Sequence, residues 1–226
     1  MKRFALLLAA VILMAARAAP QPVAPQDDGV RAYRQAHEAE IVSEFAELLS
    51  LPNVAADAAN IRRNAAKLIE MMRRRGVSAR LLEGNGPPAI FGELTAPNAS
   101  RTVAIYAHYD GQPVDASKWA SPPFTPTLRD KPLEAGGRGI AFPQRGESYN
   151  PEWRLYARSA SDDKAPIIAM LAALDALKAA GRRPSVNLKF FFDGEEEAGS
   201  PNLVDIVKRN AALLQADVWL CADGPV

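Results

Sequence analysis

The chain of 226 residues is 48% hydrophobic and 23% charged, and its formal net charge is +1. These values are typical of a globular protein with one domain or two small ones. They exclude a disordered chain and give no sign of a basic surface for nucleic acid. The single cysteine, Cys221, excludes an intrachain disulfide and a zinc site built on thiolates.

The first 18 residues resemble a signal peptide. Two basic residues precede an apolar run over residues 4–16, and the Ala-Arg-Ala at 16–18 fits a small-x-small cleavage site. This run is too short for a permanent membrane anchor, which needs about 20 residues. We therefore expect an exported protein, periplasmic or secreted, with no permanent membrane span. Residues 19–29 follow as a proline-rich spacer without a core of its own.

Two amphipathic helices are predicted next. Apolar residues at helical spacing over 30–51 end at a proline, and a second run over 56–75 ends at Gly76. His37, on the first helix, is interpreted as a surface or packing residue. The three arginines at 73–75 lie in the last turn of the second helix, where they complement the helix dipole.

Strands alternate with helices in the rest of the chain. The predicted strands are 77–83, 89–94, 102–107, 186–192 and 217–222, and the predicted helices are 165–180 and 202–214. Residues 114–153 are rich in proline and glycine and are predicted to be a long loop, of a kind that often lies near a site. The alternation predicts an α/β sandwich with a mostly parallel central sheet.

Polar residues follow three of these strands directly. His108 and Asp110 follow the third strand, Glu195–Glu197 follow the fourth, Asp223 follows the last, and Asp162-Asp163 precede a helix. Sites in open α/β sheets form at the carboxyl ends of strands, so we expect these groups to share one crevice. One imidazole with several carboxylates suits zinc or another first-row divalent ion. Two ions can share a bridging carboxylate, and a further carboxylate can act as general base.

Each group also has a structural interpretation. A His-x-Asp after a strand can be structural, a run of glutamates is often a solvated surface, and Asp162 or Asp163 could be the N-cap of the following helix. The order and strand-end placement of all the groups together favour a metal site.

Three segments resemble, in order, the signature segments of the co-catalytic dizinc metallopeptidases (peptidase family M twenty). They are AIYAHYDGQP at 104–113, LYARSASDDKAP at 155–166 and FFFDGEEEAGS at 190–200. This family groups aminoacylase, carnosinase-type dipeptidases, carboxypeptidase G and succinyl-diaminopimelate desuccinylase. The resemblance covers residues 30–226 and is greatest to the dipeptidase branch. It implies a three-layer α/β sandwich like that of the zinc-peptidase catalytic domain.

The resemblance also implies a role for individual residues. Its implied metal ligands are His108, Asp162, Glu197 and Asp223. Asp162 would bridge two zinc ions, or cobalt or manganese in their place, and a cis peptide would join it to Asp163. Asp110 would orient the imidazole of His108. Glu196 would be the general base.

The implied activity is hydrolysis of the amide bond in dipeptides or short peptides, by a water that the two zinc ions activate. Two alternatives stay open: an N-acyl amino acid amidohydrolase or desuccinylase with the same centre, and a non-catalytic relic or binding module. The expected partner is therefore a small peptide or an N-acyl amino acid, and no nucleic acid.

The sequence departs from the family pattern at several positions. Ala157, Ser159 and Ala165 stand where the family usually has glycine, so the loop that carries Asp162 could be shifted. The chain also stops three residues after Asp223. We therefore expect residues 30–226 to be the N-terminal part of the catalytic domain, without the lid and dimerisation domain and the last histidine ligand. A full-length form could be a homodimer.

Overall fold

The computed structural model describes residues 28–224, so the predicted signal peptide and most of the predicted spacer lie outside the described residues. None of the helices that residues 28–224 form combines the length and hydropathy that crossing a bilayer requires.

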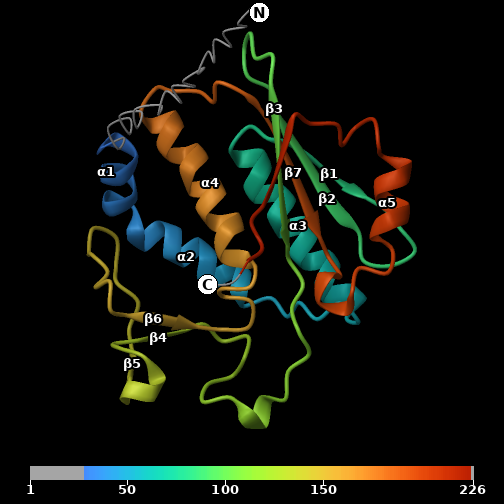
Figure 1. The fold of residues 1–226 in the computed structure, drawn as a ribbon. Coiled ribbons are helices and arrows are strands. Elements are labelled where there is room, and N and C mark those ends of the chain that lie inside the picture. The colour runs from blue at the N-terminus through green and yellow to red at the C-terminus, as the bar shows by residue number, and fades with distance from the viewer. Residues whose placement is uncertain (1–27, 225–226) are drawn as a thin grey trace, which may run out of the picture.

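The central sheet has the strand order β1-β2-β7-β3-β8. Its strands are β1 (Ser78–Leu82), β2 (Ala89–Leu94), β7 (Asn187–Asp193), β3 (Thr102–His108) and β8 (Val218–Cys221). β2 is antiparallel to both of its neighbours, whereas β7, β3 and β8 are parallel to one another. Only β2 therefore runs against the other strands of this sheet, and the predicted α/β fold with a mostly parallel sheet is confirmed (Figure 1).

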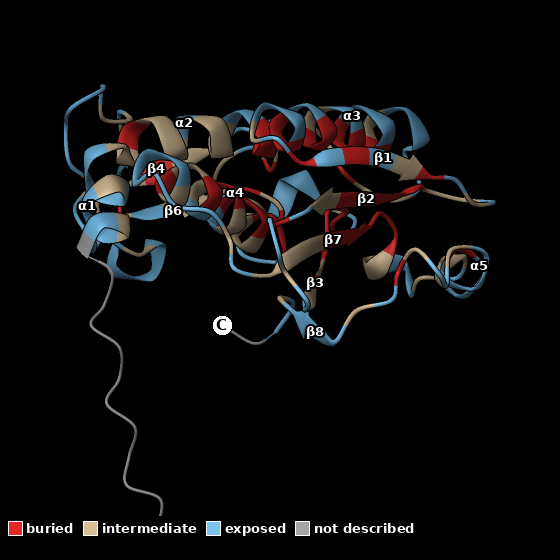
Figure 2. Cartoon of the chain, turned by 90° about the horizontal axis from the view of Figure 1, so that it is seen from above, coloured by how far each residue is buried: buried red, intermediate tan, exposed pale blue. Residues whose placement is uncertain are grey.

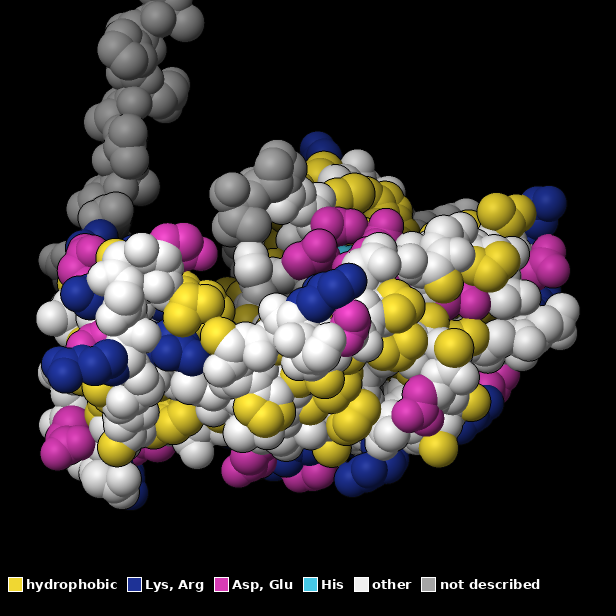
Figure 3. All heavy atoms as spheres, turned by 90° about the horizontal axis from the view of Figure 1, so that it is seen from below, with side chains coloured by type: hydrophobic (Ala, Val, Ile, Leu, Met, Phe, Trp, Pro, Cys, Tyr) yellow, Lys and Arg dark blue, Asp and Glu magenta, His cyan; other side chains and the backbone are white. Residues whose placement is uncertain are grey.

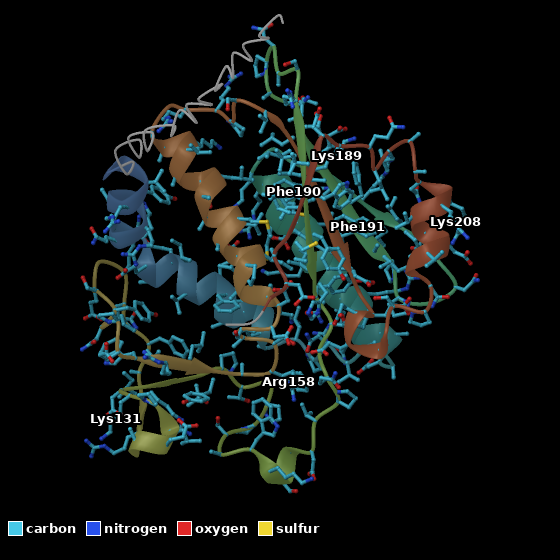
Figure 4. The ribbon with its side chains drawn as sticks, in the orientation of Figure 1. Lys131, Arg158, Lys189, Phe190, Phe191 and Lys208 are labelled. Atoms are coloured by element: carbon cyan, nitrogen blue, oxygen red, sulfur yellow. The ribbon has the colours of Figure 1, made fainter. Side chains whose placement is uncertain are left out.

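Helices cover both faces of this sheet (Figure 2). On one face lie α2 (Glu38–Leu49), α3 (Ala58–Arg74) and α4 (Lys164–Ala179), and on the other lies α5 (Leu203–Arg209). The side chains of β7 alternate between the two faces, as those of any strand do. Phe190 and Phe192 pack into the core beneath α3 and α4, whereas Phe191 packs against Ile206 of α5 (Figure 4). The predicted three-layer sandwich is confirmed.

The start and stop signals of α3 act as the sequence indicates. The Asp57 carboxylate accepts a hydrogen bond from the Asn60 backbone N–H at 3.1 Å, and Gly76 follows the helix with φ 83°. The single helix predicted over 30–51 is wrong, because the chain forms α1 (Asp28–Ala36) and α2 with a break at His37. The imidazole of His37 stacks on Tyr33 at the break, with the ring centroids 4.0 Å apart.

Two further predictions are wrong in extent. The helix predicted over 202–214 ends at Arg209, where the Asn210 side chain donates to the Ile206 carbonyl and competes with the helical ladder. The loop predicted over 114–153 contains regular structure: the 3-10 turns η1 (Ala116–Lys118) and η2 (Leu133–Ala135), and the strands β4 (Thr127–Arg129) and β5 (Gly139–Ile140). β4 pairs with β5 and with β6 (Arg154–Tyr156), which lies 25 residues further on, from Arg129 to Arg154. Local sequence patterns do not reveal such pairing.

The arginines at the end of α3 connect helices. Arg74 and Arg75 both form ion pairs with Glu44 of α2, at 2.6 Å in each case. Arg75 also pairs with Asp175 of α4 at 2.7 Å and donates to two backbone carbonyls. Besides complementing the dipole of α3, these side chains therefore hold α2, α3 and α4 together.

Candidate metal centre

The candidate centre begins where β3 ends. His108 is the last residue of β3, pairs in register with Asp193 of β7, and has a fully buried imidazole. Tyr106 pairs with Cys221 of β8, so Asp223 lies two residues beyond the paired end of that strand. Since β3, β7 and β8 are parallel, the polar residues after them meet at one edge of the sheet. Figure 3 shows acidic side chains gathered on this side of the molecule.

Three carboxylates surround the imidazole of His108. Its Nε2 lies 2.8 Å from Asp162 Oδ1 and 3.9 Å from Glu196 Oε2. Its Nδ1 faces Asp110, 3.3 Å from Oδ1. Asp110 thus occupies one side of the ring, and Nε2 is directed at the other acidic groups.

Asp110 also binds the loop that follows β7. Its buried carboxylate accepts hydrogen bonds from the backbone N–H groups of Glu196 and Glu197, at 3.0 and 3.1 Å. The side chain of Glu197 accepts a further bond from Gln112 Nε2 at 2.6 Å. Asp110 therefore joins the segment that carries the histidine to the segment that carries the two glutamates.

The acidic run after β7 divides into two halves. Asp193 and Glu195 are only 1% and 3% exposed. Asp193 accepts from the Ser200 hydroxyl at 2.6 Å, and Glu195 accepts from the backbone N–H and side-chain amide of Asn202 at 2.7 and 3.0 Å. These two residues shape the loop, whereas Glu196 and Glu197 are the pair that Asp110 holds. The solvated-surface interpretation is therefore wrong for Glu195, whereas Glu196 and Glu197 are partly exposed.

Asp162 and Asp163 lie in the loop between β6 and α4, and the peptide between them is cis, as the resemblance implies. Asp163 stands at the N-cap position of α4, but its side chain makes no capping hydrogen bond. Its buried carboxylate accepts instead from the His108 backbone N–H at 3.0 Å. Asp162 is exposed and reaches the His108 ring. Asp163 is therefore the N-cap residue by position, as one alternative predicted, but neither aspartate side chain caps the helix.

The electrostatics of the cluster favour a bound cation. Burial alone would lower the pKa of His108, but the carboxylates of Asp110 and Asp162 outweigh it and raise this pKa to about 9. Burial raises the pKa of Asp163 to about 6 and also raises the pKa of Glu196. Negative charge is thus in excess here, and each of these groups is driven to hold a proton. A metal cation would compensate the same charge.

The donor atoms have the chemistry of a metal site. Within residues 28–224, ligand atoms of His108, Glu196 and Asp223 lie within 4.8 Å of one another. One imidazole nitrogen with carboxylate oxygens fits zinc or a similar divalent ion. The structure thus brings His108, Asp110, Asp162, Glu196 and Asp223 together. The carboxylate of Glu197 is bound to Gln112 and is not a member of this trio.

Sequence reasoning missed the residues beneath this cluster. Asn53, Asn64 and Lys164 are all completely buried. Lys164 Nζ donates to the Leu48 carbonyl at 3.0 Å and to Asn64 Oδ1 at 2.7 Å, which fixes the start of α4 to the helices below. Only Lys164 stood in a recognised motif. Asn53 follows a proline, which indicates no more than a turn, and Asn64 is one polar residue within α3.

Comparisons with known proteins agree with this architecture. The model of Peptidase family M20/M25/M40 matches residues 104–225, a range that contains all six predicted site residues. The chain is 29% identical over 186 residues to the Cys-Gly metallodipeptidase dug1 of Schizosaccharomyces pombe, a match that covers 76% of this chain and 35% of that protein. It is 33% identical over 124 residues to the human Beta-Ala-His dipeptidase, covering 54% and 20%.

Among solved structures, a metallo-carboxypeptidase of the M20 family from Sulfolobus solfataricus superimposes with a TM-score of 0.67 and 32% identity. The match covers 83% of this chain and 38% of that structure. The matches to the two dipeptidases cover 35% and 20% of those proteins, so this chain spans about a third or less of their length.

Proposed function

The chain belongs to Peptidase family M20/M25/M40, and on that premise we propose that it forms a metal-dependent centre for hydrolysis of the amide bond in dipeptides or short peptides. The observation that carries the proposal is the convergence of His108, Asp162, Glu196 and Asp223 at the carboxyl ends of parallel strands. The dipeptidases among the relatives favour dipeptides as the substrate class.

The buried imidazole supports a ligand role for His108. Asp110 faces Nδ1, which fixes the ring orientation and leaves Nε2 as the ligand atom. We assign His108, Asp162 and Asp223 to one zinc ion, and Asp162 with Glu197 to a second. When bound, two such ions would polarise the substrate carbonyl and make an attacking water more acidic.

Glu196 is the proposed general base. Its carboxylate is partly buried beside His108, and burial raises its pKa, which favours a group that first accepts a proton and then releases it. Glu196 Oε2 would accept the proton of the attacking water and deliver it to the leaving amine nitrogen. Asp110 would hold the loop of Glu196 in place through the backbone bonds described above.

The test is a comparison of zinc content and hydrolysis in matched variants of the chain. We expect wild-type protein to bind zinc and Glu196→Gln to keep that zinc while hydrolysis of Cys-Gly falls by at least about 10²-fold. Glu197→Gln should lose one zinc equivalent, and exposed Glu152→Gln should change neither. Loss of zinc in Glu196→Gln would show that Glu196 is a metal ligand and not the base. Glu196 would then bind the metal together with His108 and Asp223, whose ligand atoms lie within 4.8 Å of its own.

The alternative predicted from the sequence, an N-acyl amino acid amidohydrolase or desuccinylase, would use the same residues. Faster hydrolysis of N-acetyl or N-succinyl amino acids than of dipeptides would favour it. We also propose that the protein is exported. This proposal rests on the composition of residues 1–18, which we expect to be removed on export. Absence of the protein from the exported fraction would contradict export, and exported material whose N-terminal sequence begins at Met1 would contradict the removal.

A further inference from the structure

Ser159 has an unusual backbone conformation for its residue type. It lies three residues before Asp162, in the loop between β6 and α4, and its φ is 61°. This left-handed region favours glycine, and other residues occupy it where the surroundings hold them there. Ser159 is also almost completely buried. Its side chain, which a glycine would lack, is therefore the feature to explain.

The hydroxyl of Ser159 connects two other segments. Its Oγ accepts a hydrogen bond from Asn53 Nδ2 at 2.9 Å and donates to the Asp110 carbonyl at 3.3 Å. A Cβ at Gly111 would overlap with this oxygen, so the segment after β3 can approach Ser159 only because position 111 is glycine. One hydroxyl thus links the loop of Asp162 to the segment of His108 and Asp110.

Asn53 completes the connection from below. Its Nδ2 also donates to the Tyr109 carbonyl at 2.9 Å, and the backbone carbonyl of Asn53 accepts from the Gly111 N–H at 2.9 Å. Val54 forms a parallel bridge with Gly111. The segment between α2 and α3 is therefore fastened both to residues 109–111 and to Ser159.

The loop of Asp162 is anchored on both sides of that residue. Ser159 holds it at one end, and its carbonyl accepts from the Lys164 N–H at 3.2 Å. Lys164 holds the other end through its buried side chain. Arg158, labelled in Figure 4, adds a contact with the Trp119 ring, with its guanidinium carbon 5.1 Å from the centroid.

We propose that Ser159 and Asn53 are positioning residues of the metal centre, which hold Asp162 beside His108 before any metal binds. The proposal rests on the proposed function for its connection to zinc, whereas the hydrogen bonds that carry it join residues of this chain to one another. It assigns a role to a residue that stands where a glycine is usual. The left-handed backbone supplies the turn, and the hydroxyl supplies the link that glycine cannot make.

The test uses the full chain with its histidine rings labelled with ¹⁵N. The sequence has two histidines, so His37 is an internal reference for His108. The variant is Ser159→Gly, which removes the hydroxyl but suits the positive φ, and Ser159→Ala is made beside it. Ser50→Ala is the matched control, because Ser50 is exposed and its hydroxyl donates to the nearby Glu47 carbonyl. Ile61→Val, a core change in α3, controls for general destabilisation.

We expect Ser159→Gly to shift or broaden the His108 ring signals in metal-free protein while the His37 signals stay unchanged. Zinc affinity by titration calorimetry should weaken about tenfold, the scale of one lost buried hydrogen bond. Unchanged His108 signals, or an equal change in Ile61→Val, would overturn the positioning role. If wild-type chain binds no zinc, the proposed function fails, and the ring signals of the metal-free variants still decide the positioning role.

Discussion

Asp110→Asn tests whether one buried carboxylate joins the histidine segment to the glutamate loop. Asp110 Oδ1 accepts from the Glu196 N–H and Oδ2 accepts from the Glu197 N–H, with His108 Nδ1 on the same side as Oδ1. Asparagine keeps the shape of the side chain but has only one acceptor oxygen. One of the two N–H groups must then face an amide NH₂ in a buried position.

The magnitude follows from these contacts. A hydrogen bond to a charged group contributes about 1.5–3 kcal/mol, and a buried donor left unpaired costs about 1–3 kcal/mol. Asparagine would also remove the repulsion between the charges of Asp110 and Glu196, which opposes the loss. This effect is small, because burial is the first cause of the raised pKa of Glu196 and the charge of Asp110 is a minor one. We therefore expect metal-free Asp110→Asn to lose about 3–5 kcal/mol of unfolding free energy, or about 6–20 °C in Tm for a chain of this size.

The assay is urea unfolding in the presence of a chelator, with Asp162→Asn as the contrasting variant. The side chain of Asp162 is 63% exposed and bonds the His108 ring, so its replacement should change stability by less than about 1 kcal/mol. Both variants should bind zinc more weakly, with Asp110→Asn weaker than wild type by about 10–100-fold. Equal urea midpoints for Asp110→Asn and Asp162→Asn would refute the reasoning.

Three other predictions concern stability. Arg75→Met should lower the free energy of unfolding in urea by about 2–4 kcal/mol, because Asp175 and Glu44 lose a buried ion-pair partner, although Arg74 still pairs with Glu44. A smaller loss than in exposed Arg138→Met would contradict this. The ion pair with Arg62 lowers the pKa of Glu83, so its small stabilisation should be present at pH 7 and be lost as the pH falls below the usual glutamate pKa of 4.5 and through the lowered one. Glu83→Gln should accordingly differ less from wild type at pH 3 than at pH 7. Chelation should lower the Tm of the zinc-loaded chain, because zinc at 100 times its Kd adds about 2.7 kcal/mol, and a Tm that is unchanged by a chelator would argue against zinc binding.

Most of the candidate site was predictable because its signals are local. His108 ends a strand and Glu196 follows one within a few residues, and strands that alternate with helices form parallel sheets whose carboxyl ends meet. The glycine that follows α3 and the Asp57 cap are local signals in the same sense. Such features depend on neighbours in the chain, and the amino-acid order contains those neighbours.

The small sheet and the roles of buried Asn53 and Ser159 were not predictable, because they depend on contacts between segments that are distant in the sequence. β4 and β6 are three residues each, too short for a periodic pattern, and they are defined by pairing with each other. Asn53 is a metal-centre support only because Ser159, 106 residues away, lies against it. Nothing next to Asn53 in the chain distinguishes it from an ordinary turn residue, and the signature segment around Ser159 does not reveal which residue its hydroxyl contacts.

The sequence by itself determined the family, the alternation of strands and helices, and which acidic and imidazole side chains stand at strand ends. Only the tertiary structure decided which members of the acidic run are structural: Asp193 and Glu195 are buried and accept hydrogen bonds from Ser200 and Asn202, whereas Glu196 and Glu197 are held at the site by Asp110. The physical reason is that burial and hydrogen-bond partners, not residue type, decide what a carboxylate does. Those partners come from segments that meet only when the sheet has formed.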